Sequence, residues 1–251
     1  MTGLVRRGPG TDPDPDRAQT AVVGVAILLG LTVLAVAGLS ATAGSIVEDG
    51  AASATATRVA DDLETALGPA SGARTTTLAL DSGSMRVVNR SVWVLGEGGV
   101  VWAGHAGAIV YADGGHRVTG FAGAVVHRDD RGRRLLAPSR LAPADDALYL
   151  GVPVLNASGA DGVATGGHGL DVALRTDARA RRIDLPPGRY RVGFETETPA
   201  AWERHLRERG ATTTRRDVDG DGVPSVVAAF DGPRRVHLIV HDVRLRVAVG
   251  R

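Results

Sequence analysis

The stretch DRAQTAVVGVAILLGLTVLAVAGLS (Asp16–Ser40) decides how the rest of this chain is interpreted. It belongs to a run of 29 residues without a charge, from Gln19 to Val47. About 20 apolar residues are enough for a helix to cross the hydrocarbon core of a membrane. A secretory signal peptide has a shorter apolar region of about 7–15 residues. The stretch therefore predicts a membrane-spanning helix that stays on the protein.

The basic residues around this helix predict its orientation. Arg6, Arg7 and Arg17 precede it, and the first basic residue after it is Arg58. Cytoplasmic flanks of membrane helices carry an excess of Lys and Arg. We therefore expect a single-pass protein of the cell membrane, with a cytoplasmic N-terminus and an extracellular C-terminal domain.

The helical pattern continues beyond the apolar stretch, in SIVEDGAASATATRVADDLETALGPA from Ser45. Apolar residues recur there at spacings of three and four, which is typical of an amphipathic helix, and Gly68-Pro69 is a helix-ending pair. We expect a leader of residues 1–18 and one long helix over residues 19–68, membrane-spanning in its first half. The expected apolar face of its second half is Ile46, Val47, Ala51, Ala54, Val59, Leu63 and Leu67.

From Thr75 onward the sequence changes to short apolar runs broken by Gly, Asp and Pro. Runs spaced by about 8–12 residues favour antiparallel strands. The predicted fold class is therefore α+β: the long helix, followed by a mainly antiparallel, sandwich-like β domain over residues 69–251 with one short helix. The expected strands are Thr75–Leu80, Ser84–Leu95, Val100–Ala103, Ala108–Ala112, Arg117–Phe121, Ala124–His127, Arg134–Ala137, Ala147–Leu155, Leu170–Arg175, Arg181–Leu185, Arg189–Glu195, Val226–Phe230 and Arg235–Val249.

The last of these strands has an irregular apolar pattern. Its apolar residues occupy even positions up to Val240 and odd positions from Val243. One face of a regular strand holds residues of one parity only, so this pattern predicts a bulge or bend near His241–Asp242.

The short helix is predicted after Thr198. Thr198 is a suitable N-cap, Pro199 suits the first helical position, and Gly210 ends the helix. Trp202 and Leu206 share one face, so we expect Trp202 to dock this helix on the sheet.

DVDGDGVPSVVA, which starts at Asp217, is the most motif-like acidic stretch. Asp217, Asp219 and Asp221, with Gly at the sixth position, match the start of an EF-hand-type calcium loop. The twelfth position, which should be Glu, is Ala228. The stretch is either a calcium site or an acidic hairpin turn.

Three histidines, His105, His116 and His127, recur at intervals of 11 residues. In a β meander this spacing would place imidazoles on adjacent strands and create a metal site. The alternative is that each is an ordinary exposed histidine, because each lies beside Gly or charged turn residues.

Composition excludes several classes of function. The chain has no Cys, 29 basic and 28 acidic residues, and no basic stripe, so it has no thiolate chemistry and is not expected to bind nucleic acid. None of the common nucleophile, phosphate-loop or HExxH motifs occurs, and we do not expect an enzyme. Two N-x-S acceptors, Asn89 and Asn156, are candidate glycosylation sites in an extracellular domain.

The segment RAQTAVVGVAILLG from Arg17 resembles the N-terminus of archaeal type IV pilin-like proteins and archaellins. The later GAVVHRDDRGRRLLAPSRLAPADDALYLGVPVL and AAWERHLRERGATTTRRDVDGDGVPSVVAAF are similar to segments of haloarchaeal pilin-like membrane proteins. The resemblance implies that a prepilin-type peptidase cuts between Ala18 and Gln19, with Arg17 as the basic leader residue. Ala18 stands where Gly is more usual, and Val23 replaces the acid of bacterial pilins.

The resemblance implies a cell-surface subunit that joins identical or related pilin-like subunits in a filament after leader cleavage. The alternative is an uncleaved single-pass membrane protein whose extracellular β domain binds a ligand or partner. A third interpretation is a calcium-dependent surface module that uses Asp217–Asp221.

Overall fold

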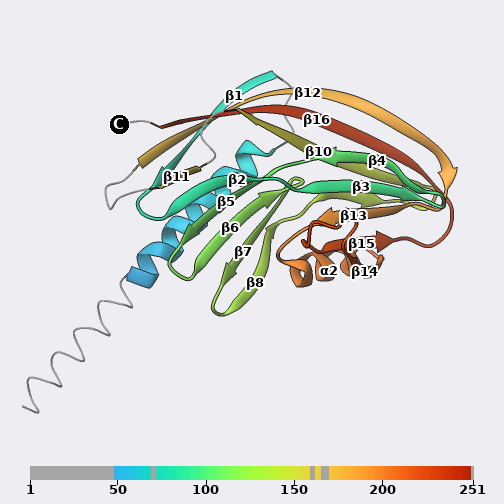
Figure 1. The fold of residues 1–251 in the computed structure, drawn as a ribbon, viewed down its shortest axis with the longest axis horizontal. Helices are drawn as coiled ribbons and strands as arrows, with labels where there is room; N and C mark the ends of the chain where they lie inside the picture. Colours follow the sequence, from blue (N-terminus) through green and yellow to red (C-terminus); the bar gives the residue numbers. More distant parts are fainter. Residues whose placement is uncertain (1–47, 69–71, 159–161, 165–169, 250–251) are drawn as a thin grey trace, which may run out of the picture. The chain divides into compact units, whose positions relative to one another are not determined.

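The computed structural model describes residues 48–68, 72–158, 162–164 and 170–249, and Asp49–Arg251 form one compact unit (Figure 1). The described residues contain a first helix (residues 48–66), a short helix α2 (Pro199–Glu208) and three sheets.

Sheet A has the strand order β1 (Gly72–Leu80), β12 (Leu170–Gly188), β16 (Arg234–Val249), β10 (Ala147–Ser158), β9 (Arg140–Pro143). Sheet B has the order β11 (Gly162–Ala164), β2 (Ser84–Val88), β5 (Ala108–Asp113), β6 (His116–Phe121), β7 (Ala124–Asp129), β8 (Gly132–Ala137). Sheet C has the order β14 (Thr212–Arg216), β15 (Ser225–Ala229), β13 (Arg191–Glu195), β3 (Ser91–Gly96), β4 (Gly99–His105).

These sheets confirm the expected domain, which is mainly β and mainly antiparallel. One pairing in sheet A departs from that rule, because β10 runs parallel to β16 over twelve residue pairs, Ala147↔Arg235 to Ser158↔Arg246. Figure 1 shows the two long strands, β12 and β16, running side by side along sheet A.

Two apolar clusters hold the sheets together. The first, named the Trp202 core, joins α2 and sheet C to parts of sheets A and B. Its large members include Phe121, Leu141, Leu148, Leu150, Phe194, Trp202, Leu206, Val236 and Leu238. The second, named the helix core, surrounds the first helix; its large members include Val59, Leu63, Leu78, Leu80, Met85, Ile109, Tyr111, Val118, Val172 and Leu174.

The first helix lies between strands of sheets A and B, and its buried face follows the amphipathic pattern in part. Val59, Leu63 and Leu67 are buried as expected, with exposed fractions of 0 to 4%. The expected burial of Ala51 and Ala54 is wrong, because both residues are exposed. The segment is so rich in Ala that the larger residues alone indicate which side packs. Residues up to Val47, including the leader and the whole membrane-spanning half of the expected helix, lie outside the described residues.

Across the part of the chain that the structure describes, no helix has the length and apolarity needed to cross a membrane.

The expected bulge near His241–Asp242 is wrong. Strand β16 keeps an unbroken register through these residues with both β12 and β10. Val240 is buried in the Trp202 core, whereas Val243 is buried in the helix core. Because alternate residues point to opposite faces, one regular strand buries Val240 on one face and, farther along, Val243 on the other.

The division into strands differs from the sequence prediction in two places, and β9, β11 and β14 lie where no strand is expected. The expected strand Ser84–Leu95 is split into β2 and β3, which belong to different sheets, because the carbonyl of Arg90 accepts the N–H groups of Ala106 and Gly107 at the break. Conversely, the two strands expected over Leu170–Arg175 and Arg181–Leu185 are one strand, β12. Its polar middle lacks an apolar alternation but pairs continuously with β16.

Helix α2 lies where the sequence predicts it. Thr198 is the N-cap residue and Pro199 begins the helix, but the Thr198 side chain makes no capping hydrogen bond. Trp202 is 1% exposed and stacks on Phe194, with ring centroids 4.6 Å apart. Gly210 follows the helix with φ +80°. The expected docking role of Trp202 is therefore confirmed.

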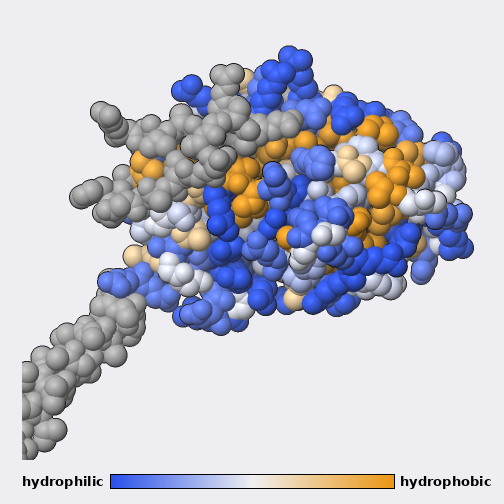
Figure 2. Space-filling view, in the orientation of Figure 1, coloured by the Kyte–Doolittle hydropathy of each residue, from blue (hydrophilic) through white to orange (hydrophobic). Residues whose placement is uncertain are grey.

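The exposed apolar residues are few among those described. Figure 2 shows apolar surface on one face of the unit, set among hydrophilic residues. The exposed large apolar side chains are Val100, Val101, Leu136, Tyr149 and Ile239.

Candidate functional site

Strands β6 and β7 of sheet B carry two histidines and an aspartate on the face that packs against the first helix. His116 begins β6, and His127 and Asp129 lie near the end of β7. Val118 stands opposite His127 in the antiparallel register and is buried in the helix core. Residues two apart on a strand share a face, so all three side chains belong to the same face as Val118.

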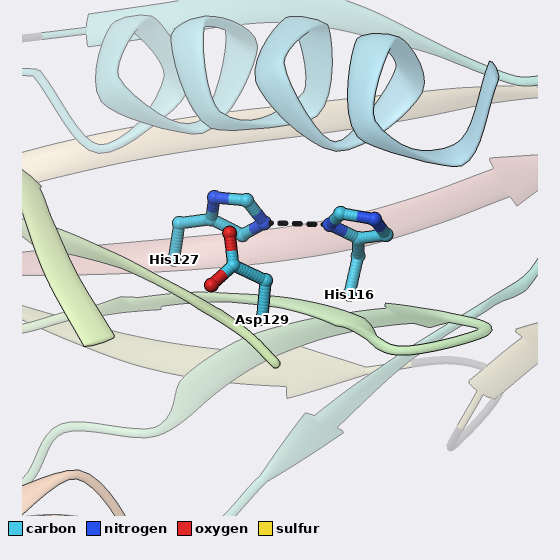
Figure 3. A group of neighbouring side chains, drawn as sticks. All are labelled: His116, His127 and Asp129. Carbon is cyan, nitrogen blue, oxygen red and sulfur yellow. Dashed lines mark hydrogen bonds between the residues drawn. The ribbon is translucent and has the colours of Figure 1, made fainter. Parts of the chain in front are cut away.

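The two imidazoles meet nitrogen to nitrogen. His116 Nδ1 lies 3.2 Å from His127 Nε2, and each side chain is 4% exposed. The rings are nearly parallel, at 16°, with centroids 5.3 Å apart. Figure 3 shows both rings beneath a helix, with the Asp129 carboxylate beside them. One ligand atom from each of the three residues lies within 4.8 Å of the others.

The first helix contributes a fourth polar group to this cluster. Asp49 Oδ1 lies 2.9 Å from His116 Nε2. A carboxylate accepts the imidazole N–H, so His116 carries its proton on Nε2 when neutral and presents a lone pair at Nδ1. His127 Nε2–H then donates to that lone pair. The result is a hydrogen-bonded chain from the first helix through β6 to β7.

Electrostatics favour neutral His127 beside ionised Asp129. Burial lowers the pKa of His127, and the neighbouring His116 and Arg134 act in the same direction against the attraction of Asp129. Burial acts to raise the pKa of Asp129, but backbone N–H groups of Arg131 and Gly132 and nearby cationic groups hold it below its ordinary value. His127 therefore offers an imidazole lone pair, and Asp129 a carboxylate, near neutral pH.

His105 does not join this cluster. It lies on β4 of sheet C, where its Nδ1 is 3.4 Å from Ser91 Oγ. The regular interval of 11 residues therefore brings together two of the three histidines. The pairing follows from the β6–β7 hairpin, whereas β4 and β6 belong to different sheets.

The acidic loop from Asp217 has a different construction. The Asp217 carboxylate accepts the N–H groups of Gly220 (2.8 Å) and Gly222 (3.0 Å), as expected of an acidic turn. Asp221 Oδ1 accepts the N–H of Val223. The carboxylates grouped within 4.8 Å of one another are those of Asp219, Asp221 and Glu195.

Glu195 reaches this loop from the end of β13 and is 2% exposed. Its Oε2 accepts the N–H of Ser91 at 2.9 Å, and its Oε1 lies 3.5 Å from Arg90 Nη1. Burial, together with the charge of Asp221, raises the pKa of Glu195, while Arg90 opposes the shift. Glu195 thus supplies a carboxylate that the Ala228 position of the loop lacks, and calcium binding by Asp217, Asp219 and Asp221 stays a prediction.

The two candidate glycosylation sites differ in their structural surroundings. Asn89 is exposed between β2 and β3, as a glycosylated asparagine requires. The backbone of Asn156 lies within β10 and pairs with Arg244. The expected processing residues Arg17, Ala18 and Gln19 lie outside the described residues.

Three residues of the histidine cluster and the acidic loop are not predicted from the sequence: Asp129, Asp49 and Glu195. Asp129 carried a usable signal, because His-x-Asp places His127 and Asp129 on one face of a strand. Asp49 carried no such signal, because it lies 67 residues from His116 in the sequence. Glu195 carried none either, because it lies on β13, apart from the acidic loop.

Residues 17–246 match a family of unknown function (DUF7289). The chain belongs to this family. The DUF7289 match spans both the apolar stretch and the β domain, so the two parts occur together as one family unit. No curated protein and no solved structure matches the chain.

Proposed function

We propose that this chain is a pilin-like cell-surface subunit. Its apolar segment spans the cell membrane, and the sandwich-like β domain lies outside the cell. A prepilin-type peptidase removes the leader between Ala18 and Gln19. The freed helix then packs with the helices of identical or related subunits, and the β domain covers the outside of the filament.

The observation that carries this proposal is the packing of the first helix into the core of the β domain. The uncharged run ends at Val47, and the chain is helical from the next residue. Val59 and Leu63 on that helix are fully buried in the helix core. This packing supports the proposal, because an assembling subunit requires the residues that follow its apolar segment to be held firmly in the β domain.

Two arginines also hold the C-terminal end of the first helix. Arg140 at the start of β9 donates from Nη2 to the carbonyl of Leu67 at 2.7 Å. Arg74 on β1 donates from Nη1 to the carbonyl of Thr65 at 3.0 Å. Carbonyls in the last turn of a helix lack their usual partner four residues later, and the Thr65 carbonyl accepts the N–H of Gly68 at 3.2 Å instead. The two arginines add cationic donors at this end, where the helix dipole favours positive charge.

The test is the N-terminal residue and intact mass of the full-length protein isolated from its native membrane. We expect a mature chain that begins at Gln19. A chain that begins at Met1 or Thr2 would replace the proposal with the single-pass, ligand-binding alternative. Arg17→Glu is expected to abolish processing, whereas Arg6→Glu, in the same leader, serves as the matched control and should leave the mature mass unchanged.

The approach of Glu195 to Asp219 and Asp221 favours one form of the alternative, a calcium-dependent surface module. Calcium binds carboxylate oxygens, and three lie together here. This form predicts that millimolar calcium raises the Tm of the purified protein and that Asp219→Asn removes the increase. Asp145→Asn, in the turn before β10, is the control.

A further inference from the structure

The spacing of the two imidazole nitrogens matches that of two ligands on one metal ion. Zinc binds His nitrogen at about 2.0–2.1 Å in tetrahedral geometry, which separates two ligand nitrogens by about 3.3 Å. His116 Nδ1 and His127 Nε2 are 3.2 Å apart. An ion seated between them takes the place of the shared proton, and neutral His127 then carries its proton on Nδ1 instead of Nε2. Neither strand needs a large movement.

Asp129 distinguishes a metal site from a simple histidine pair. Its carboxylate has an oxygen within 4.8 Å of one nitrogen of each imidazole, yet the described hydrogen bonds of the histidines do not involve it. Asp129 Oδ1 accepts the N–H of Arg131 at 3.0 Å, which fixes the carboxylate in place. The N–H of Gly132 also bonds this carboxylate, and Arg134 Nη2 lies 3.8 Å from its Oδ2. A carboxylate has about four lone-pair directions, so these contacts leave capacity for a metal ion.

We propose that His116, His127 and Asp129 form a binding site for a divalent transition-metal ion, with zinc as the best match. Two imidazoles and one carboxylate are donors that suit zinc and its neighbours rather than calcium or magnesium. His116 binds through Nδ1, His127 through Nε2 and Asp129 through a carboxylate oxygen. Three protein ligands leave a fourth position for water or for a donor from another molecule.

Asp49 is a positioning residue for this site. Metal-bound histidines commonly donate their other N–H to a carboxylate, which fixes the ring and its tautomer. Asp49 Oδ1 holds His116 Nε2 at 2.9 Å and so directs Nδ1 toward His127. Because Asp49 lies in the first turn of the described helix, metal binding on the β6–β7 hairpin also ties that end of the helix to sheet B.

Access comes from a pocket of about 140 Å³ beside the histidines, lined by Asp49, Gly115, His116, Asp129, Asp130 and Arg131. Its exposed carboxylates attract a cation, and the pocket has room for a metal-bound water. Two cations oppose them: Arg131, and Arg134, whose Nη2 lies 3.8 Å from Asp129 Oδ2. Both arginines are exposed, so solvent screens their repulsion of the ion.

The experiment is a zinc titration by isothermal titration calorimetry. The full-length protein, purified in detergent without a polyhistidine tag and stripped with EDTA, is titrated with zinc chloride and, separately, with calcium chloride. We expect one zinc ion per chain bound by the histidine site, and cobalt(II) is expected to give the visible absorption of a four-coordinate ion with nitrogen ligands.

Three variants assign the ion to its ligands. His127→Gln and Asp129→Asn should each weaken zinc binding at least 100-fold, and Asp49→Asn should weaken it about 10- to 100-fold, as expected when an outer carboxylate is lost. His105→Gln is the matched control and should bind zinc as the parent protein does. Circular dichroism identifies the variants that fold, and Asp129→Asn, at the pocket edge, replaces His127→Gln if the latter unfolds.

Two results would overturn the proposal. One is the absence of stoichiometric zinc binding to the stripped protein. The other is zinc binding that survives in folded Asp129→Asn and His127→Gln, which would leave the hydrogen-bonded chain from Asp49 to His127 as the full account of the cluster. Neither result depends on whether the leader is cleaved.

Discussion

The Trp202 core and the helix core each pack a helix against β-sheets, but with different side chains. In the Trp202 core, two sheets supply most of the apolar surface, and α2 adds one large aromatic side chain stacked on Phe194. In the helix core, a whole helix rich in small residues fills the space between strands of sheets A and B. In the first arrangement α2 contributes one large aromatic side chain, whereas in the second the helix contributes Val59 and Leu63 among buried alanines.

Trp202→Ala is expected to have the largest effect. Trp202 is 1% exposed and also meets Phe121 edge-on at 5.7 Å. Truncation of a buried aromatic residue costs about 3–5 kcal/mol. Chemical denaturation of the full-length protein should show this loss, and amide hydrogen exchange should accelerate mainly in α2 and sheet C. Equal acceleration in the first helix would mean that the two cores unfold as one.

Leu63→Ala tests the helix core in the same way. Leu63 is fully buried, and buried Leu→Ala substitutions cost about 2–5 kcal/mol. We expect faster amide exchange in the first helix and in β6, with α2 less affected. Glu64→Ala, at the exposed neighbouring position, should change the free energy of unfolding by less than about 0.5 kcal/mol.

The Trp202 core also contains a pH-sensitive contact. His205 in α2 is 4% exposed, and its Nε2 lies 2.9 Å from Ser139 Oγ. Burial, aided by Arg209, lowers the pKa of His205 from 6.5 to about 4. Between these values the unfolded chain binds a proton that the folded chain does not, so stability falls as the pH falls from 6.5 toward 4.

At about 1.4 kcal/mol per pKa unit, this contribution amounts to roughly 3 kcal/mol at pH 4. His205→Gln, which keeps a polar group for Ser139, should reduce the slope of the free energy of unfolding against pH in that window. Some slope will remain, because burial also lowers the pKa of His127 and His241. An unchanged slope in His205→Gln would contradict the assignment.

Gly120→Ala should have the smallest effect of these changes. A Cβ at Gly120 on β6 would lie 2.7 Å from Leu67 Cδ1 and 3.5 Å from Leu63 Cδ1. Overpacking of this kind costs about 1–3 kcal/mol, and the end of Leu67 has some freedom to move. Gly98→Ala, where no heavy atom lies within 4 Å of the added Cβ, is the matched control for thermal unfolding.

Local patterns anticipated much of this fold. Short apolar runs separated by turn residues indicated most strands, and the Thr198–Gly210 segment indicated α2 and its docking tryptophan. They failed at β16, where a change of parity was interpreted as a bulge. The change reflects the position of the two cores on opposite faces of one sheet, which no pattern within a strand records.

The candidate metal sites likewise separate what the sequence determines from what the tertiary structure determines. The sequence alone determined that His116, His127 and the acids from Asp217 are candidate ligands, because residue type and spacing are local properties. Only the tertiary structure decided that His105 lies in another sheet, that Asp49 orients His116 and that Glu195 joins Asp219 and Asp221. Metal ligands must meet within a few ångströms, and strand pairing across distant parts of the chain determines which residues do so.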